Sequence, residues 1–245
     1  MNRPKSYKRE YVETFEDGPG GWYAWISNFE GPKPIVFENS RVTARSPWWI
    51  DYNHAPPGAG YMHMLASLST YGPQTEAIKE MGGPNRFIAG GYPTDFTHAK
   101  MTVRLKGELL KRNAELVLLV QGGVEGICSG WLLTGQTLQV SKEWTEQTLT
   151  LVPHPTQWTA LGSRHDRTDT YGVKPLDKVL RNVDFNIMLV MYPLNVVPMG
   201  SVSGDPHALR AGHDYPVWPS KLPEGYIILD EVRIHFAGES TPEDG

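Results

Sequence analysis

The sequence predicts an all-β protein, an antiparallel β-sandwich with long loops and at most short helices. In residues 101–106, Met, Val and Leu alternate with Thr, Arg and Lys, which is the period of a half-buried strand. Residues 116–120 form a short continuous apolar run, as expected for a strand covered on both faces. The chain also has 25 glycines and 20 prolines, which fits many short strands better than βαβ units.

The remaining elements follow from the same kinds of pattern. Residues 144–151 are rich in Thr, residues 185–192 are apolar on both faces, and Val232, Ile234 and Phe236 share one face of the last strand. Further strands are expected at 10–15, 22–28, 35–44, 61–69 and 127–140. Two short helices are expected at 74–81 and 175–181.

The length and composition predict one domain. A chain of 245 residues, 40% hydrophobic and 20% charged, suits a single β domain with a sizeable core. We expect this domain to span residues 10–238, between a flexible start (1–9) and a flexible tail (239–245).

Charge and hydropathy bear on partners and location. The formal net charge of −4 gives no electrostatic reason to expect nucleic acid, which favours a basic face. No stretch is long and apolar enough to predict a membrane span. The basic first residues are not followed by the apolar segment of a secretory signal, which predicts a cytoplasmic protein, or a secreted one if a leader has been removed. The single Cys128 is expected to be a small buried residue.

Acidic residues lie beside the first and last strands. Phe15-Glu16-Asp17-Gly18 precedes the aromatic cluster Trp22-Tyr23-Trp25, and the last strand contains Ile228-Leu229-Asp230-Glu231-Val232. This arrangement resembles the jelly-roll β-sandwich of carbohydrate-binding modules and concanavalin-like carbohydrate-active proteins, in architecture and without the motif of one family. The resemblance implies that the first and last strands pair, and that a structural calcium is held by Glu16, Asp17 and Asp230. From the residues alone, Asp17-Gly18 is a turn and Asp230 a strand-edge residue.

Three long irregular segments remain, at 46–60, 153–175 and 196–224, and the expected cleft extends the first of them to residue 63. Long segments without regular structure are uncommon in compact domains and are often functional. These three also hold most of the histidines. We therefore expect them to form a cleft.

The first loop carries an expected substrate-binding surface. Adjacent tryptophans offer flat apolar rings on which sugar rings can pack, while polar neighbours bind hydroxyl groups. Tyr61 and His63 share a face of the next strand. The alternative is that one tryptophan is core and the rest stabilise a proline-rich turn. With one residue from the third loop, the expected set is Trp48, Trp49, Asp51, Tyr52, Asn53, Tyr61, His63 and Trp218.

The second and third loops supply the expected catalytic groups. His titrates near neutrality, Arg clamps carboxylates and Tyr can relay a proton. The alternative is a solvated loop whose charges pair with one another. With one residue from the first loop, the expected set is His54, Arg164, His165, Asp166, Tyr171, His213 and Asp214.

These sets favour an enzyme that acts on a saccharide or a related polyhydroxylated compound and requires no cofactor. As a glycoside hydrolase it would use two carboxylates, with Asp51, Asp166 and Asp214 as candidates. As a lyase it would use a His or Tyr base, with Arg steadying the enolate. Two alternatives stay open: a non-catalytic carbohydrate-binding protein, and a structural or assembly subunit with an aromatic protein interface. A homo-oligomer is compatible with each.

Overall fold

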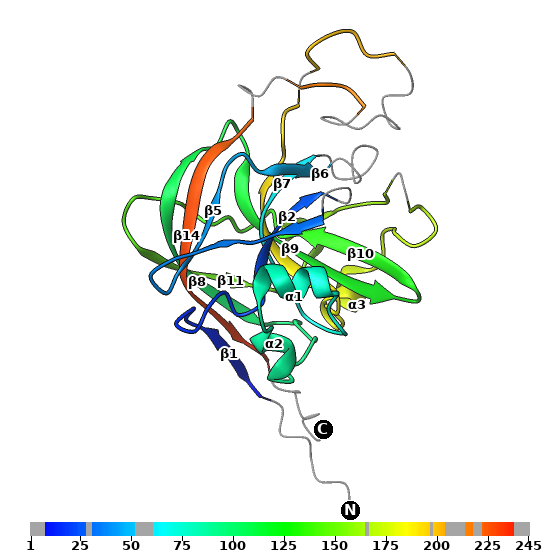
Figure 1. Cartoon of the computed structure of the whole chain (residues 1–245). Helices are drawn as coiled ribbons and strands as arrows, with labels where there is room; N and C mark the ends of the chain where they lie inside the picture. Colours follow the sequence, from blue (N-terminus) through cyan, green and yellow to red (C-terminus); the bar gives the residue numbers. More distant parts are fainter. Residues whose placement is uncertain are drawn as a thin grey trace, which may run out of the picture.

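Two antiparallel sheets pack face to face in the computed structural model of the protein (Figure 1). The structure describes residues 8–27, 31–51, 61–164, 167–196, 198–203, 214–217 and 222–237, apart from the side chains of residues 25–27, 31 and 51. The pairings between its named strands are antiparallel. The predicted all-β sandwich is confirmed.

The six-stranded sheet is organised around the last strand of the chain. Its order is β11 (Thr145–Thr150), β8 (Lys100–Leu110), β14 (Glu224–His235), β5 (Val42–Arg45) and β4 (Val36–Phe37). On the side of β14 away from β8, β5 pairs with its first half and β1 (Glu10–Glu13) with its end. The expected pairing of the first and last strands is therefore confirmed.

The eight-stranded sheet is the larger of the two. Its order is β12 (Thr159–Ala160), β10 (Ile127–Leu132), β9 (Glu115–Val124), β13 (Asn186–Tyr192), β7 (Met62–Ser69), β2 (Trp22–Ser27) and β3 (Gly31–Lys33). The short β6 (Trp49–Asp51) pairs with the first half of β7. β9 and β13 lie at the centre and are paired on both edges.

Helices are few and short. They are α1 (Glu76–Gly82), α2 (Arg86–Ala89), α3 (Leu176–Leu180) and the 3₁₀ turn η1 (Pro155–Gln157). In Figure 1, α2 lies at the lower end of the sandwich near β1, whereas α1 lies nearer the middle, where it contacts β2 and β3. The longest helix among the described residues has seven residues, and none of these helices could cross a membrane.

The expected element boundaries were wrong in three places. Residues 35–44 make the hairpin β4–β5 instead of one strand, because Asn39 and Ser40 turn the chain with φ of 53° and 57°. The strand expected at 127–140 ends at Leu132. The first expected irregular loop contains β6, since its Trp49–Asp51 segment pairs with β7.

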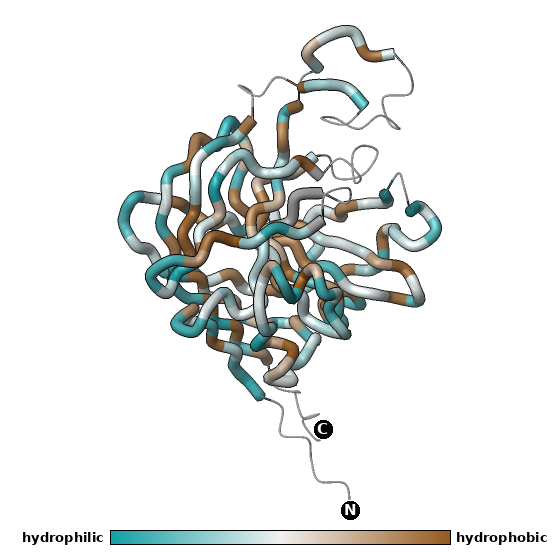
Figure 2. The backbone as a smooth tube through the Cα atoms, viewed as in Figure 1, coloured by the Kyte–Doolittle hydropathy of each residue, from teal (hydrophilic) through white to brown (hydrophobic). Residues whose placement is uncertain are grey.

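The main core fills the space between the sheets. Inward side chains of β8 (Met101, Val103, Leu105) face those of β9 (Leu116, Leu118, Val120), and all six are buried. Figure 2 shows the corresponding brown stretches gathered in the interior, with teal stretches on the turns. The alternation predicted for β8 and the two-sided burial predicted for β9 are both confirmed.

A second apolar cluster covers the other face of the eight-stranded sheet. It is formed by alternate residues of the central strands together with residues of β10 and the loop after β12. The strands β9 and β13 are thus buried on both faces. The members of the cluster are Met62, Met64, Val117, Leu119, Leu132, Leu161, Met188 and Val190.

A buried ion pair fastens β1 to α2. The Glu13 side chain is only 1% exposed, and both of its oxygens accept hydrogen bonds from Arg86, at 2.6 and 2.9 Å. Arg86 also donates to the backbone carbonyls of Asp17 and Gly18. Gly20, with φ of 64°, lies against this pair, where a Cβ would collide with the Glu13 carboxylate. One guanidinium therefore fixes the strand, the turn and the helix.

We predict that Arg86→Ala lowers the free energy of unfolding by about 3 kcal/mol, because it leaves the buried Glu13 carboxylate without its charged partner. Urea unfolding followed by circular dichroism measures this. The matched control is Lys79→Ala, which breaks the exposed Lys79–Glu76 pair and should cost less than about 1 kcal/mol. Equal losses in the two variants would contradict the role given to the ion pair.

Candidate functional site

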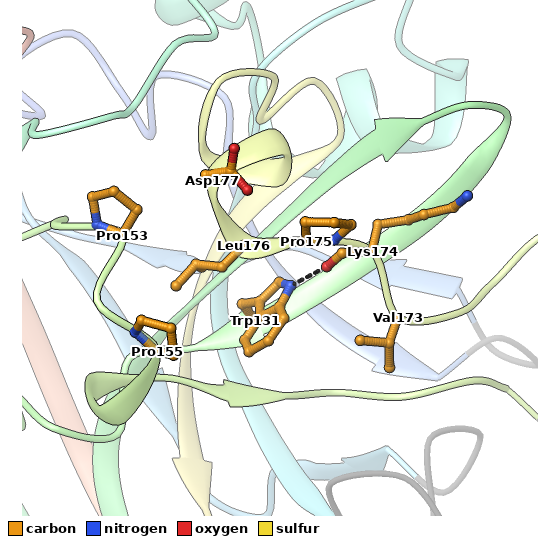
Figure 3. A pocket seen from close by; sticks show the side chains of 8 residues that line it. All are labelled: Trp131, Pro153, Pro155, Val173, Lys174, Pro175, Leu176 and Asp177. Carbon is orange, nitrogen blue, oxygen red and sulfur yellow. Dashed lines mark hydrogen bonds between the residues drawn. The ribbon is translucent and has the colours of Figure 1, made fainter.

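An open hollow of about 510 Å³ lies beside β10, the strand next to the edge strand β12 of the eight-stranded sheet (Figure 3). Its volume falls within the range of about 300–1,000 Å³ that is typical of small-molecule sites. Three segments meet there: β10, the turn around η1, and the chain leading into α3. The lining residues are Trp131, Pro153, Pro155, Val173, Lys174, Pro175, Leu176 and Asp177.

Trp131 is the largest side chain of the hollow. It lies on β10 opposite Val120, so one side of its ring packs against the main core. Its indole Nε1 donates a hydrogen bond of 3.0 Å to the backbone carbonyl of Lys174, drawn in Figure 3. This bond satisfies the indole and fixes its orientation, and the ring also lines the hollow.

Three prolines give the hollow a rigid apolar wall. Pro153 and Pro155 flank His154 at the start of η1, while Pro175 precedes the first residue of α3. The ring of each proline fixes its own φ, so little conformational freedom is lost when a ligand binds against it. Val173, whose side chain is exposed, and the buried Leu176 complete the apolar lining.

Two charged residues border this apolar surface. The Nζ of Lys174 pairs with Glu125 at 2.8 Å, so the Lys174 side chain is already oriented by a carboxylate. Asp177 lies in the first turn of α3, half-buried. The aromatic ring and the proline walls can pack against the C–H face of a sugar ring. The Asp177 carboxylate can accept hydrogen bonds from the hydroxyl groups of the same ring.

A smaller hollow of about 140 Å³ lies at the predicted binding loop. Trp48 and Trp49 line it, together with Arg45 and Thr43 of β5. Trp48 belongs to the core, which confirms the alternative proposed for one of the two tryptophans. The volume is below the usual range for small-molecule sites.

His63 packs beside Trp48 on the core side of β7. Their ring centroids are 5.8 Å apart, and His63 Nδ1 lies 3.3 Å from the Trp49 carbonyl, to which it donates. Trp48 Nε1 and His63 Nε2 are buried, and the described part of the chain offers neither a hydrogen-bond partner. One is a donor and the other, in this tautomer, an acceptor, so a single hydroxyl group matches both. Two predicted binding residues are thus brought together.

Burial lowers the pKa of His63 to about 4, and the hydrogen bond to the Trp49 carbonyl opposes this only in part. The imidazole is 2% exposed and hence neutral at neutral pH. It is placed to accept or donate a hydrogen bond rather than to carry charge.

Arg164 and Tyr171, two predicted catalytic residues, lie together. The Arg164 guanidinium lies 4.6 Å from the centre of the Tyr171 ring. The backbone of Tyr171 forms a bridge with Cys128 on β10. Burial raises the pKa of the Cys128 thiol to about 12 and also raises that of Tyr171. The cysteine is buried as predicted, and the phenol is held protonated.

Other predicted residues lie apart or outside the description. Tyr61 is hydrogen-bonded through its hydroxyl to Tyr215, at 3.3 Å, and Asp214 is exposed. The backbone of Asp51 lies in β6. Outside the described residues lie Tyr52, Asn53, His54, His165, Asp166, His213 and Trp218.

The residues expected to hold calcium do not fit one site. Both carboxylate oxygens of Asp230 face arginine Nε atoms at 2.8 Å, one from Arg41 and one from Arg104. Glu16 and Asp17 are exposed. Among the residues that the structure describes, no three His, Cys, Asp or Glu side chains come together as a metal site. At this end of the sandwich, the cation that binds β1 is the Arg86 guanidinium.

Sequence reasoning missed Trp131 as a site residue. The loop 153–175 was expected to be functional, whereas residues 127–140 were expected only to form a strand. The prolines at 153, 155 and 175 were the available signal, since they predict rigid turns near one another. Nothing in the sequence places β10 beside them.

We predict that wild-type stability falls between pH 7 and pH 5 by about 2 kcal/mol more than that of His63→Gln. The unfolded histidine gains a proton near pH 6.5 whereas the folded one resists protonation down to about pH 4, so falling pH favours unfolding in this window. Urea unfolding at both pH values measures the difference. The control His154→Gln, at an exposed histidine, should show the same change of stability with pH as the wild type. The same change of stability with pH in all three proteins would contradict the prediction.

Comparisons with known proteins identify no family for the chain. No protein-family model matches the chain, and neither does any curated protein. One similar solved structure comes from work on the endo-acting O-glycanases with which prominent members of the human gut microbiota initiate mucin breakdown. It is 11% identical and has a TM-score of 0.38, covering 93% of this chain and 99% of that one. The L4b domain of human laminin α-2 is 10% identical, with the same TM-score, over 94% and 98%. At these TM-scores the similarities carry no argument about function.

Proposed function

We propose that the protein binds a saccharide in the hollow lined by Trp131. The observation that carries the proposal is the indole itself, oriented by its bond to the Lys174 carbonyl and bordering an apolar hollow of about 510 Å³. The C–H face of a sugar packs on such a ring, and Asp177 can accept hydrogen bonds from its hydroxyls. The volume suits one or two sugar rings better than a long chain.

Binding is supported better than catalysis by the described residues. A lyase base must accept a proton near neutral pH, whereas burial keeps Tyr171 protonated and His63 lies on the core side of β7. The hydrolase and lyase hypotheses stay predictions, because most of their proposed residues lie outside the description.

We predict that Trp131→Ala weakens saccharide binding about 30-fold, because truncation of a central aromatic anchor typically costs about 2 kcal/mol. A panel of neutral mono- and oligosaccharides, measured by isothermal titration calorimetry, finds the ligand and then compares the variants. Trp131→Phe keeps a ring but loses the hydrogen bond, and should bind with intermediate affinity.

The matched control is Tyr71→Ala, which removes an aromatic ring that is 67% exposed and lies outside the hollow. It should bind like the wild type. Undiminished binding by Trp131→Ala would place the ligand elsewhere. Release of new products from the same panel, detected by mass spectrometry, would replace the binding proposal with an enzymatic one.

A further inference from the structure

The outer face of the six-stranded sheet carries cations arranged around two aromatic rings. Three of them surround Trp144: the Arg41 and Arg104 guanidinium carbons lie 5.1 and 5.5 Å from the ring centroid, and the Lys106 ammonium lies 4.8 Å from it. We call this set, with Arg45 and Tyr226, the basic strip. Its members are Arg41, Arg45, Arg104, Lys106, Trp144 and Tyr226.

Register places these residues in adjacent rows. Lys106 pairs with Ile228, and Tyr226, two residues earlier on β14, pairs with Arg45 on β5. The Arg45 guanidinium lies 4.6 Å from the centre of the Tyr226 ring. Residues two apart on a strand are separated by roughly 7 Å, so the rows of Arg104, Lys106 and Tyr226 span about 14 Å.

Asp230 lies among these four cations, whereas Glu231 and Glu146, which flank Arg104 in register, both pair with Arg233. Asp230 receives the Nε atoms of Arg41 and Arg104, each at 2.8 Å. The described residues provide no other hydrogen bond or ion pair to either guanidinium, so their terminal nitrogens are available to an external acceptor. Asp230 therefore orients two guanidinium forks through their inner nitrogens.

The remaining charges leave the strip positive. Lys106 and Arg45 have no carboxylate partner among the described residues; their recorded contacts are with the rings. Glu108, in the Tyr226 row, accepts from the Tyr226 hydroxyl and lies 3.4 Å from Lys142, which balances it. Arg41 and Arg104 have side chains 42% and 45% exposed, so a ligand can reach them.

We propose that the basic strip binds the carboxylate groups of an acidic polysaccharide. Planar guanidinium groups match carboxylates in two-pronged contacts, and Lys106 adds a point charge in the next row. Trp144 and Tyr226 are each already in contact with cations, which disfavours the base stacking by which proteins hold single-stranded nucleic acid. The overall charge of −4 also opposes a polyanion of high charge density.

This site lies on a different sheet from the Trp131 hollow and does not depend on the proposed function. Its test is affinity electrophoresis and calorimetry with polygalacturonate, fully methyl-esterified polygalacturonate and a single-stranded oligonucleotide. The wild type should bind polygalacturonate, less tightly as salt rises, and should not bind the uncharged ester. Trp131→Ala should leave this binding unchanged.

The double variant Arg104→Gln, Lys106→Gln should lose at least tenfold in affinity for polygalacturonate, as expected when a charged contact is lost. The matched control, Lys79→Gln with Arg181→Gln, removes the same charge at exposed residues beside the eight-stranded sheet and should bind like the wild type. Thermal unfolding checks that each variant is folded. Equal weakening in both double variants, binding of the ester as tight as that of the acid, or tighter binding of the oligonucleotide would each overturn the proposal.

Discussion

The Glu13–Arg86 ion pair holds the end of the sandwich where the first and last strands meet. β1 has only four residues, which is too short to be stable by its ladder alone. Arg86 fixes it from α2, and α2 in turn exists because the Asn85 side chain caps it by accepting from Ile88. Tyr11, Phe87, Phe96 and Phe236 pack edge-on or stacked around this junction. The packing of the core at this end therefore depends on the ion pair between the buried Glu13 carboxylate and Arg86.

The sequence was most informative for strands whose buried and exposed faces follow directly from the order of apolar and polar residues. Alternation in β8 and β14, and the unbroken apolar run of β9, were enough to predict strands and their buried faces. The sequence did not predict elements whose formation depends on residues far away in the chain. α2 is four residues long and depends on Glu13, and β6 exists because β7 offers it a free edge. The β4–β5 turn places Asn39 and Ser40 at positive φ, and without a glycine this pair is a weaker hairpin signal than Asn-Gly.

The kinds of residue at the candidate site were predicted better than their positions in the fold. Loop 153–175 does border the larger of the two hollows, and Arg164 with Tyr171, and Trp48 with His63, do come together. However, residue types could not say which side chains would be buried, and burial determines whether a histidine or tyrosine titrates near neutrality. Trp131 and Trp144 were overlooked because their neighbours come from segments that are far from them in the sequence.

The double burial of the eight-stranded sheet has a consequence for how the molecule opens. β9 and β13 are covered on both faces and paired on both edges, so their amides can exchange with solvent only when the whole domain unfolds. β4, two exposed residues at a sheet edge, can detach without disturbing the rest. Trp131, adjacent to β9, therefore rests on the part of the protein expected to exchange most slowly, and its hydrogen bond to the Lys174 carbonyl holds the turn before α3 against that part.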